Sequence, residues 1–131
     1  MASVRYIVTD VPKAVAFYGK LGFTVQEQFP AMAIMKQGDL TLWLAGPQAS
    51  ASRPMPDGRV PEPGGWNRFV LETKDLAALV EKLRAGSTKF RNDIVSGPGG
   101  KQILAEDPFG NVVELFEPAA VMPSSRGPRS G

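Results

Sequence analysis

The pattern of apolar and polar positions along the chain occurs twice. In each half, a segment of alternating apolar and polar residues leads through an aspartate, Asp10 or Asp75, into apolar residues spaced as on one face of a helix. A glycine then follows, Gly22 or Gly86, and each half closes on a second alternating segment. The two aspartates lie 65 residues apart, which is about half of the 131 residues. The repeat predicts two copies of one strand–helix–strands unit, with functional residues at matched positions of the copies.

The first half is expected to begin with a strand over residues 4–9 and a helix that Asp10 caps and that ends near Gly22. Residues 47–65 are rich in Pro, Gly, Ser and Ala, which indicates a loop that joins the halves. Between the helix and this loop, apolar segments predict strands over residues 24–29, 32–36 and 40–45, with a tight turn at Gly38 and Asp39.

The second half repeats this plan. A strand over residues 67–73 is followed by a helix that Asp75 caps and that ends near Ala85. Residues 119–131 contain too few apolar side chains to become ordered, so a disordered tail is expected. The remaining segments predict strands over residues 89–94, 102–106 and 111–117, with residues 107–111 as the turn before the last strand.

The composition narrows the possible functions. The chain has neither cysteine nor histidine, which excludes disulfides and thiolate chemistry and removes the commonest general base and transition-metal ligand. A net charge of +2 gives no indication of nucleic-acid binding. No apolar segment approaches the length of a membrane span and no signal sequence begins the chain. We therefore expect a globular cytoplasmic protein that binds neither nucleic acid nor membranes.

Two segments carry a family resemblance. The sequence Asp-Pro-Phe-Gly-Asn-Val-Val-Glu-Leu-Phe-Glu-Pro at 107–118 resembles the closing motif of the vicinal-oxygen-chelate superfamily, which contains glyoxalase I, bleomycin-resistance proteins and extradiol dioxygenases. The segment 8–23, Val-Thr-Asp-Val-Pro-Lys-Ala-Val-Ala-Phe-Tyr-Gly-Lys-Leu-Gly-Phe, is similar to its opening motif. The resemblance implies an α+β fold in which two tandem βαβββ modules form an open, cup-shaped, eight-stranded mixed sheet with the helices on its convex face. It implies a single domain over residues 1–118, with modules at 1–47 and 66–118 and a linker at 48–65.

The resemblance also implies four metal-ligand positions, on the first and last strands of each module, which hold His, Glu or Gln in the enzymes. Counting from the matched aspartates and prolines places Ser3 and Arg68 at the first-strand positions, and Trp43 and Glu114 at the last-strand positions. Only Glu114 is a good metal ligand, and a divalent ion needs several converging donors. A shifted alignment that brings in Glu72 still gives only two carboxylates. We therefore predict no metal and no other cofactor.

Alternation along the strands gives a second way to choose the residues that face the cup. Leu40, Leu42 and Leu44 share one face and suit the helices, which turns Trp43 toward the cup. The same reasoning applies to the other first and last strands, and Trp66 lies where the loop meets the second module, close to the expected mouth. The candidate ligand-binding residues are Arg5, Ile7, Thr41, Trp43, Trp66, Arg68, Val70, Glu72, Glu114 and Phe116, with Ala45 and Val112 also expected on this face.

Each candidate has a competing structural explanation. Arg68 is the natural counter-ion of Glu114 and would supply the positive charge of the missing metal, but Glu114 could equally serve packing while Arg68 points to solvent. Trp43 offers a flat face for stacking planar or cationic ligands, or fills space as part of the core. Trp66 either lines the cup or anchors the loop.

These observations favour a metal-free, non-enzymatic protein of the bleomycin-resistance type. We expect it to sequester an aromatic or antibiotic-like small molecule in a cup, within one chain or across a homodimer. The main alternative is a metal-independent lyase or isomerase in which Glu114 is the catalytic base and Arg68 assists. It ranks second because a carboxylate paired with arginine is a weaker base. A metal-dependent glyoxalase or dioxygenase is a more distant alternative, and a structural or partner-binding domain is also compatible with the sequence.

Overall fold

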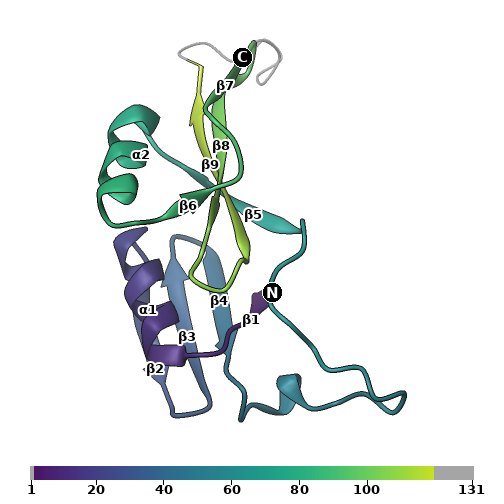
Figure 1. Cartoon of the computed structure of the whole chain (residues 1–131). Helices are drawn as coiled ribbons and strands as arrows, with labels where there is room; N and C mark the ends of the chain where they lie inside the picture. The colour runs from purple at the N-terminus through teal and green to yellow at the C-terminus, as the bar shows by residue number, and fades with distance from the viewer. Residues whose placement is uncertain (1, 120–131) are drawn as a thin grey trace. The chain divides into compact units, whose positions relative to one another are not determined.

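The computed structural model describes residues 2–119, and the sequence-predicted tail therefore lies almost wholly outside the described residues (Figure 1). Its first half follows the predicted order of one strand, one helix and three strands. The elements are β1 (Val4–Ile7), α1 (Val11–Lys20), β2 (Thr24–Gln28), β3 (Met32–Gln37) and β4 (Leu40–Ala45). The loop that follows contains one short 3-10 helix, η1 (Ser50–Ser52), which the sequence analysis did not predict.

The second half has the same order with one difference. Its elements are β5 (Arg68–Glu72), α2 (Leu76–Ala85), β6 (Lys89–Phe90), β7 (Val95–Gly97), β8 (Gly100–Glu106) and β9 (Val112–Pro118). The single strand predicted over residues 89–94 is wrong, because the chain pairs there in two short pieces. The Leu104 backbone N–H donates to the Asn92 side-chain oxygen at 2.9 Å, so a side chain replaces the backbone acceptor that would have continued the ladder.

The strands form two open, mixed sheets. In the first sheet the order is β1-β4-β3-β2, and β1 and β4 are parallel. In the second, β5-β9-β8-β6, β5 and β9 are parallel and β7 also pairs with β8. Both sheets thus place their first strand beside their last, and the predicted α+β fold of two repeats is confirmed. Within residues 2–119, no helix is long and apolar enough to cross a membrane.

The two repeats share one strand register. In the first sheet Arg5 lies opposite Trp43, and in the second Val70 lies opposite Glu114. Trp43 and Glu114 are therefore equivalent positions in the two copies. Because side chains alternate along a strand, Arg68 lies on the same face as Val70, two residues earlier.

The core of each unit lies on the face that alternation assigned to the helices. Leu42 and Leu44 of β4 are fully buried, as are Ile103 of β8 and Leu115 of β9. One alanine and one valine differ from the face that alternation predicted. Ala45 (2% exposed) and Val112 (0%) are buried, although alternation placed them on the open face. At Ala45 the reason is local, because the next residue donates its N–H to the Ala31 carbonyl at 2.8 Å and brings that backbone close.

The described chain divides into two compact units that do not coincide with the two halves of the sequence. One unit comprises the chain up to Gly65 together with Asp107–Asn111, and the other comprises Trp66–Glu106 and the chain from Val112 onward. The turn between β8 and β9 thus belongs to the first unit. A single domain over residues 1–118 stays a prediction.

Asp107 explains why this turn packs with the first unit. Its side chain is 3% exposed and accepts a hydrogen bond from the Tyr18 hydroxyl of α1 at 2.8 Å. The same carboxylate accepts the backbone N–H groups of Phe109 and Asn111, each at 2.9 Å, and the Asn111 side-chain amide at 2.9 Å. Four donors on one carboxylate compensate the cost of burying it.

Asn111 extends this network to two other segments of the first unit. Asn111 is 4% exposed. Its side-chain nitrogen Nδ2 donates to the Ile7 carbonyl, at the end of β1, at 2.8 Å. The side-chain oxygen Oδ1 of Asn111 accepts the Gly64 N–H from the end of the linker loop at 2.8 Å. One buried asparagine therefore connects the turn, the first strand and the loop.

Both helices begin and end in the same way. Asp10 and Asp75 accept the backbone N–H of the third residue beyond them, at 3.0 and 3.1 Å, which confirms them as N-caps. At the other end of α1, Gly22 has a positive φ of 95°. The equivalent residue after α2, 65 positions later, is Ser87 with φ 70°, rather than the glycine at 86. It is the only residue other than glycine with positive φ among the described residues.

We expect Ser87→Gly to stabilise the protein by about 0.5–1 kcal/mol, because glycine adopts this left-handed conformation without the Cβ penalty. Thermal or urea unfolding measures the change. Ser87→Ala is the matched control: it removes the hydroxyl but keeps the Cβ, so it should give no gain. An equal gain in both variants would contradict the backbone explanation.

A second prediction concerns Tyr18. Burial, and next the neighbouring Asp107 carboxylate, raise the pKa of Tyr18 far above its usual value of 10.0. The folded protein then keeps this tyrosine protonated at pH values where the unfolded chain ionises it. Its contribution to stability is complete below about pH 10 and declines as the pH rises further.

Urea unfolding between pH 7 and 11 should therefore show a smaller loss of stability in Tyr18→Phe than in the wild type. At pH 7 the same variant should be less stable by about 1–3 kcal/mol, because Asp107 loses a donor. Identical slopes in Tyr18→Phe and wild type would contradict the prediction.

Candidate functional site

Arg68 and Glu114 form an ion pair on the open face of the second sheet. Nε and Nη2 of Arg68 donate to the same Glu114 oxygen, Oε1, at 3.1 and 3.0 Å. The parallel pairing of β5 with β9 brings the two residues together, since Glu114 lies opposite Val70 and Arg68 lies two residues before Val70. The Glu114 side chain is 13% exposed and that of Arg68 is 32% exposed. The counter-ion expected from the sequence is therefore present, and Arg68 is not turned into solvent away from Glu114.

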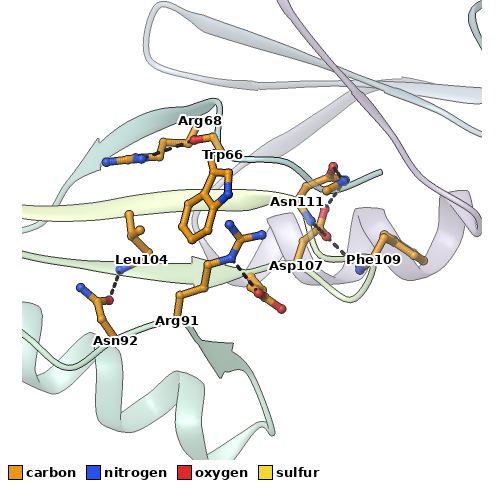
Figure 2. Close-up of polar contacts among 10 residues, drawn as sticks. Trp66, Arg68, Arg91, Asn92, Leu104, Asp107, Phe109 and Asn111 are labelled. Atoms are coloured by element: carbon orange, nitrogen blue, oxygen red, sulfur yellow. Dashed lines mark hydrogen bonds and ion pairs between the residues drawn. The ribbon is translucent and has the colours of Figure 1, made fainter. Parts of the chain in front are cut away.

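Trp66 lies next to this pair, and it connects Arg68 to a second arginine (Figure 2). Nη1 of Arg68 donates to the Trp66 carbonyl at 3.3 Å, while the guanidinium carbon of Arg91 lies 4.2 Å from the centroid of the Trp66 ring. Nε of Arg91 in turn donates to Glu106 at 2.8 Å. We call Trp66, Arg68, Arg91, Glu106 and Glu114 the arginine–tryptophan cluster.

Sequence reasoning missed Arg91 and Glu106. Arg91 follows β6, and its backbone N–H donates to the Leu104 carbonyl of β8 at 2.9 Å, which places the two chains side by side. Its side chain is 17% exposed and that of Glu106 is 26% exposed. The available signal was that Arg91 and Glu106 carry opposite charges and lie in segments expected to form strands. Their pairing could not be derived from the sequence, because it depends on where the chain breaks between β6 and β7.

In the first unit, Arg5 and Trp43 lie opposite each other on β1 and β4. The Arg5 guanidinium carbon lies 4.8 Å from the centroid of the Trp43 ring, which is the geometry of a cation–π contact. Trp43 is partly buried, so it is neither a fully buried core residue nor a fully exposed platform. Trp43, the equivalent of Glu114, therefore also has an arginine beside it. Arg5 lies directly opposite Trp43, whereas Arg68 lies two residues before the residue opposite Glu114.

The remaining candidates lie on the same open faces. Val70 is 50% exposed, Glu72 is exposed and lies opposite Phe116, and Phe116 is partly buried. Ile7 and Thr41 are partly buried on the first sheet. The structure thus gathers Trp66, Arg68, Val70, Glu72, Glu114 and Phe116 in the second unit, and Arg5, Ile7, Thr41 and Trp43 in the first.

The donor set does not suit a divalent metal ion. Of the four positions implied by the family resemblance, Arg68 and Trp43 carry no metal ligand and Ser3 is a weak one, while Glu114 already accepts two hydrogen bonds from Arg68. Within residues 2–119, no group of three or more His, Cys, Asp or Glu side chains is placed to hold a metal ion. We therefore derive no chemistry that uses a metal.

The Glu114 carboxylate is held by one guanidinium. It receives two charge-assisted hydrogen bonds from Arg68, both through the oxygen Oε1. A depression of about 400 Å³ in the same unit is lined by Arg84, Phe90, Arg91 and Asp93 among others, and includes neither Arg68 nor Glu114.

Comparison with known proteins agrees with the fold. A protein-family model described as Glyoxalase/Bleomycin resistance protein/Dioxygenase superfamily matches residues 1–115. Lactoylglutathione lyase from Agrobacterium tumefaciens has 23% sequence identity and a TM-score of 0.65, over 89% of this chain and 92% of that chain. A glyoxalase/bleomycin resistance protein/dioxygenase superfamily member from Sphaerobacter thermophilus DSM 20745 has 25% identity and a TM-score of 0.69, over 89% and 96%.

A glyoxalase/bleomycin resistance protein/dioxygenase from Nocardioides has 22% identity and a TM-score of 0.70, over 95% of this chain and 87% of that chain. No curated protein matches the sequence.

The donor set predicts that added Zn²⁺, Ni²⁺, Fe²⁺ or Mn²⁺ will not raise the melting temperature, because an ion that binds only the folded state would raise it. Metal analysis of the purified protein should likewise find no stoichiometric ion. Glu114→Gln is the control that locates any effect. A melting-temperature increase in the wild type that this variant loses would show a metal site at Glu114 and contradict the prediction.

Proposed function

Because the chain belongs to the Glyoxalase/Bleomycin resistance protein/Dioxygenase superfamily, we propose that it is a metal-free member that binds a small organic molecule without transforming it. The proposed ligand is aromatic or antibiotic-like, and the proposed role is to sequester it in the cytoplasm. The proposed binding residues are the ten candidates on the open sheet faces of the two units.

The observation that carries this proposal is the ion pair between Arg68 and Glu114. In this superfamily's enzymes, the resemblance places metal ligands at these two positions, and here a guanidinium supplies the positive charge instead. The pair holds the Glu114 carboxylate in one orientation on a partly exposed surface. Such a group can orient a polar ligand, but it lacks the open coordination position that a catalytic metal provides.

Trp43 with Arg5, and Trp66 with Arg91, supply aromatic surface next to positive charge. An aromatic side chain held by a guanidinium offers a flat contact with little conformational entropy left to lose on binding. This supports a planar ligand in preference to a flexible aliphatic one.

The second candidate function is a metal-independent lyase or isomerase with Glu114 as base and Arg68 as its partner. It is supported by the convergence of these two groups at 3.0 Å, and by the lactoylglutathione lyase among the similar structures. It ranks second because the only candidate base already accepts two hydrogen bonds from Arg68. Recovery of the bound compound unchanged after prolonged incubation separates sequestration from catalysis.

We also propose a homodimer, the state in which proteins of the bleomycin-resistance type form their cups. Light scattering at micromolar concentration should give the dimer mass. A monomer mass that does not change with concentration would contradict it.

The central test is a panel of planar antibiotics, followed by tryptophan fluorescence and calorimetry. For a compound that binds, Trp43→Ala should weaken affinity by about 1–3 kcal/mol while the protein remains folded, because a side chain on an open face leaves no closed cavity. If Trp43 serves mainly in packing, the same change should instead cost about 3–5 kcal/mol of folding stability.

Leu42→Ala is the matched control, because Leu42 is the residue before Trp43 on β4 and is fully buried on the opposite face of the sheet. It should lose about 2–5 kcal/mol of stability without changing the affinity of the folded molecules. Large loss of stability in Trp43→Ala with unchanged affinity per folded molecule would remove the proposed binding role.

A further inference from the structure

We propose that Trp66, held by Arg91, is a one-sided stacking platform, and that the preferred ligand is a planar aromatic oxyanion whose charged oxygen binds Arg68. This inference rests on the proposed binding function and specifies the chemical class of its ligand. In it, Arg68 and Trp66 contact the ligand, and Arg91 is a positioning residue that acts through Trp66.

The first step is the rigidity of Arg91. Its Nε donates to Glu106 at 2.8 Å, and its backbone N–H donates to the Leu104 carbonyl at 2.9 Å, so both ends of the residue are tied to β8. With a side chain 17% exposed, it is largely removed from solvent. A guanidinium fixed in this way holds the indole ring of Trp66 in place at 4.2 Å.

The second step is that the contact covers only one face of the ring. Trp66 remains 67% exposed, the largest exposed fraction among the large apolar side chains described. Figure 2 shows the Arg91 guanidinium lying against one side of the indole. The other side is left for a ligand, and Val70, 50% exposed, adds apolar surface on β5, the strand that begins two residues after Trp66.

The third step concerns electrostatics. A cation against one face of an aromatic ring withdraws electron density from it, so the opposite face attracts an electron-rich ring and disfavours a second cation. The platform therefore selects against cationic aromatic ligands. This selectivity distinguishes it from an isolated tryptophan, whose negative face attracts cations.

The fourth step is the hydrogen-bonding capacity of Arg68. A guanidinium has five N–H donors. Nε and Nη2 donate to Glu114 and Nη1 donates to the Trp66 carbonyl. One N–H on each terminal nitrogen has no acceptor among the described residues, and the side chain is 32% exposed. Two such donors in one plane match the two oxygens of a carboxylate.

The two carboxylates of the cluster do not oppose this assignment. Glu114 is paired with Arg68, with 3.0 Å between Oε1 and Nη2. Glu106 is paired with Arg91, with 2.8 Å between Oε2 and Nε. The cluster has two cations and two anions, so an incoming anion meets no net negative charge. A ligand carboxylate that stays beside Arg68 is held by direct hydrogen bonds rather than by long-range attraction.

The experiment uses three probes with the same naphthalene ring: the anion 2-naphthoate, the neutral 2-naphthalenemethanol and the cation 2-naphthylmethylammonium. Calorimetry or nuclear magnetic resonance titration of the wild-type protein should give the order anion, neutral compound, cation, from tightest to weakest. Arg68→Lys should weaken naphthoate binding by about tenfold or more, because it loses the planar pair of donors. The same variant should change binding of the neutral probe much less.

Arg91→Met removes the cation while keeping an apolar side chain of similar length. It should weaken naphthoate binding by about two- to fivefold and reduce the preference for the anion over the cation. Trp66→Leu should weaken all three probes. Arg84→Met is the matched control, because Arg84 also lies over an aromatic ring, Phe90, at 5.1 Å but outside the cluster. It should leave all three affinities unchanged.

A fluorescence measurement tests the positioning role without any ligand. In a Trp43→Phe background, Trp66 is the only remaining tryptophan. Adding Arg91→Met should increase quenching by acrylamide and lower the emission anisotropy, because the ring loses its cover and its anchor. Adding Arg84→Met should change neither. The melting temperature of each variant checks that it is folded, and Glu106→Gln, which keeps Arg91 but loosens it, provides a second variant if Arg91→Met unfolds.

Equal or tighter binding of the cationic probe, or naphthoate binding that Trp66→Leu and Arg68→Lys leave unchanged, overturns the inference. So does an unchanged Trp66 quenching profile in both Arg91→Met and Glu106→Gln. These results leave the proposed function intact if a panel compound still binds elsewhere on the open faces. Failure of every panel compound to bind would instead overturn the proposed function itself.

Discussion

The burial of the Asp107 carboxylate is the constraint on which the first unit depends. A carboxylate in the core is costly unless each oxygen is hydrogen-bonded, and here the donors come from α1, from the turn itself and from Asn111. Meeting that requirement fixes the turn against α1, whose Tyr18 lies 89 residues before Asp107 in the chain. The first unit is therefore complete only when the second repeat has supplied residues 107–111.

The two repeats keep one backbone plan and differ in chemistry at the positions that face outward. Trp43 and Glu114 occupy the same place in their sheets, and both lie beside an arginine. In the first repeat the contact is between a cation and an aromatic ring, and in the second it is an ion pair. Each contact is formed within its own unit, so neither side chain needs a ligand to hold its orientation.

Much of this architecture follows from local sequence. Alternation predicted the order of the strands and the buried face, because one side of each sheet must be covered, and the two aspartates predicted both helix starts. Other features depended on partners distant in sequence. The interruption at Asn92 arises from a hydrogen bond with β8, and the positive φ at Ser87 follows from how α2 ends, which the neighbouring Gly86 concealed. Arg91 was missed for the same reason: its contact with Trp66 depends on strand pairing rather than on spacing along the chain.

The unequal lengths of the two repeats show where the copies diverged. Asp10 and Asp75 are 65 residues apart, and so are Gly22 and Ser87, but Trp43 and Glu114 are separated by 71. The second copy is thus six residues longer than the first between the end of its helix and the middle of its last strand. This interval holds Arg91, Glu106, Asp107 and Asn111. By strand register Glu106 corresponds to Lys36 of the first copy, because Glu106 pairs with Val112 as Lys36 pairs with Thr41. The longer stretch of the second copy thus carries both an internal anchor, Asp107 with Asn111, and the surface contact of Arg91 with Trp66, while the strand and helix order stays common to both copies.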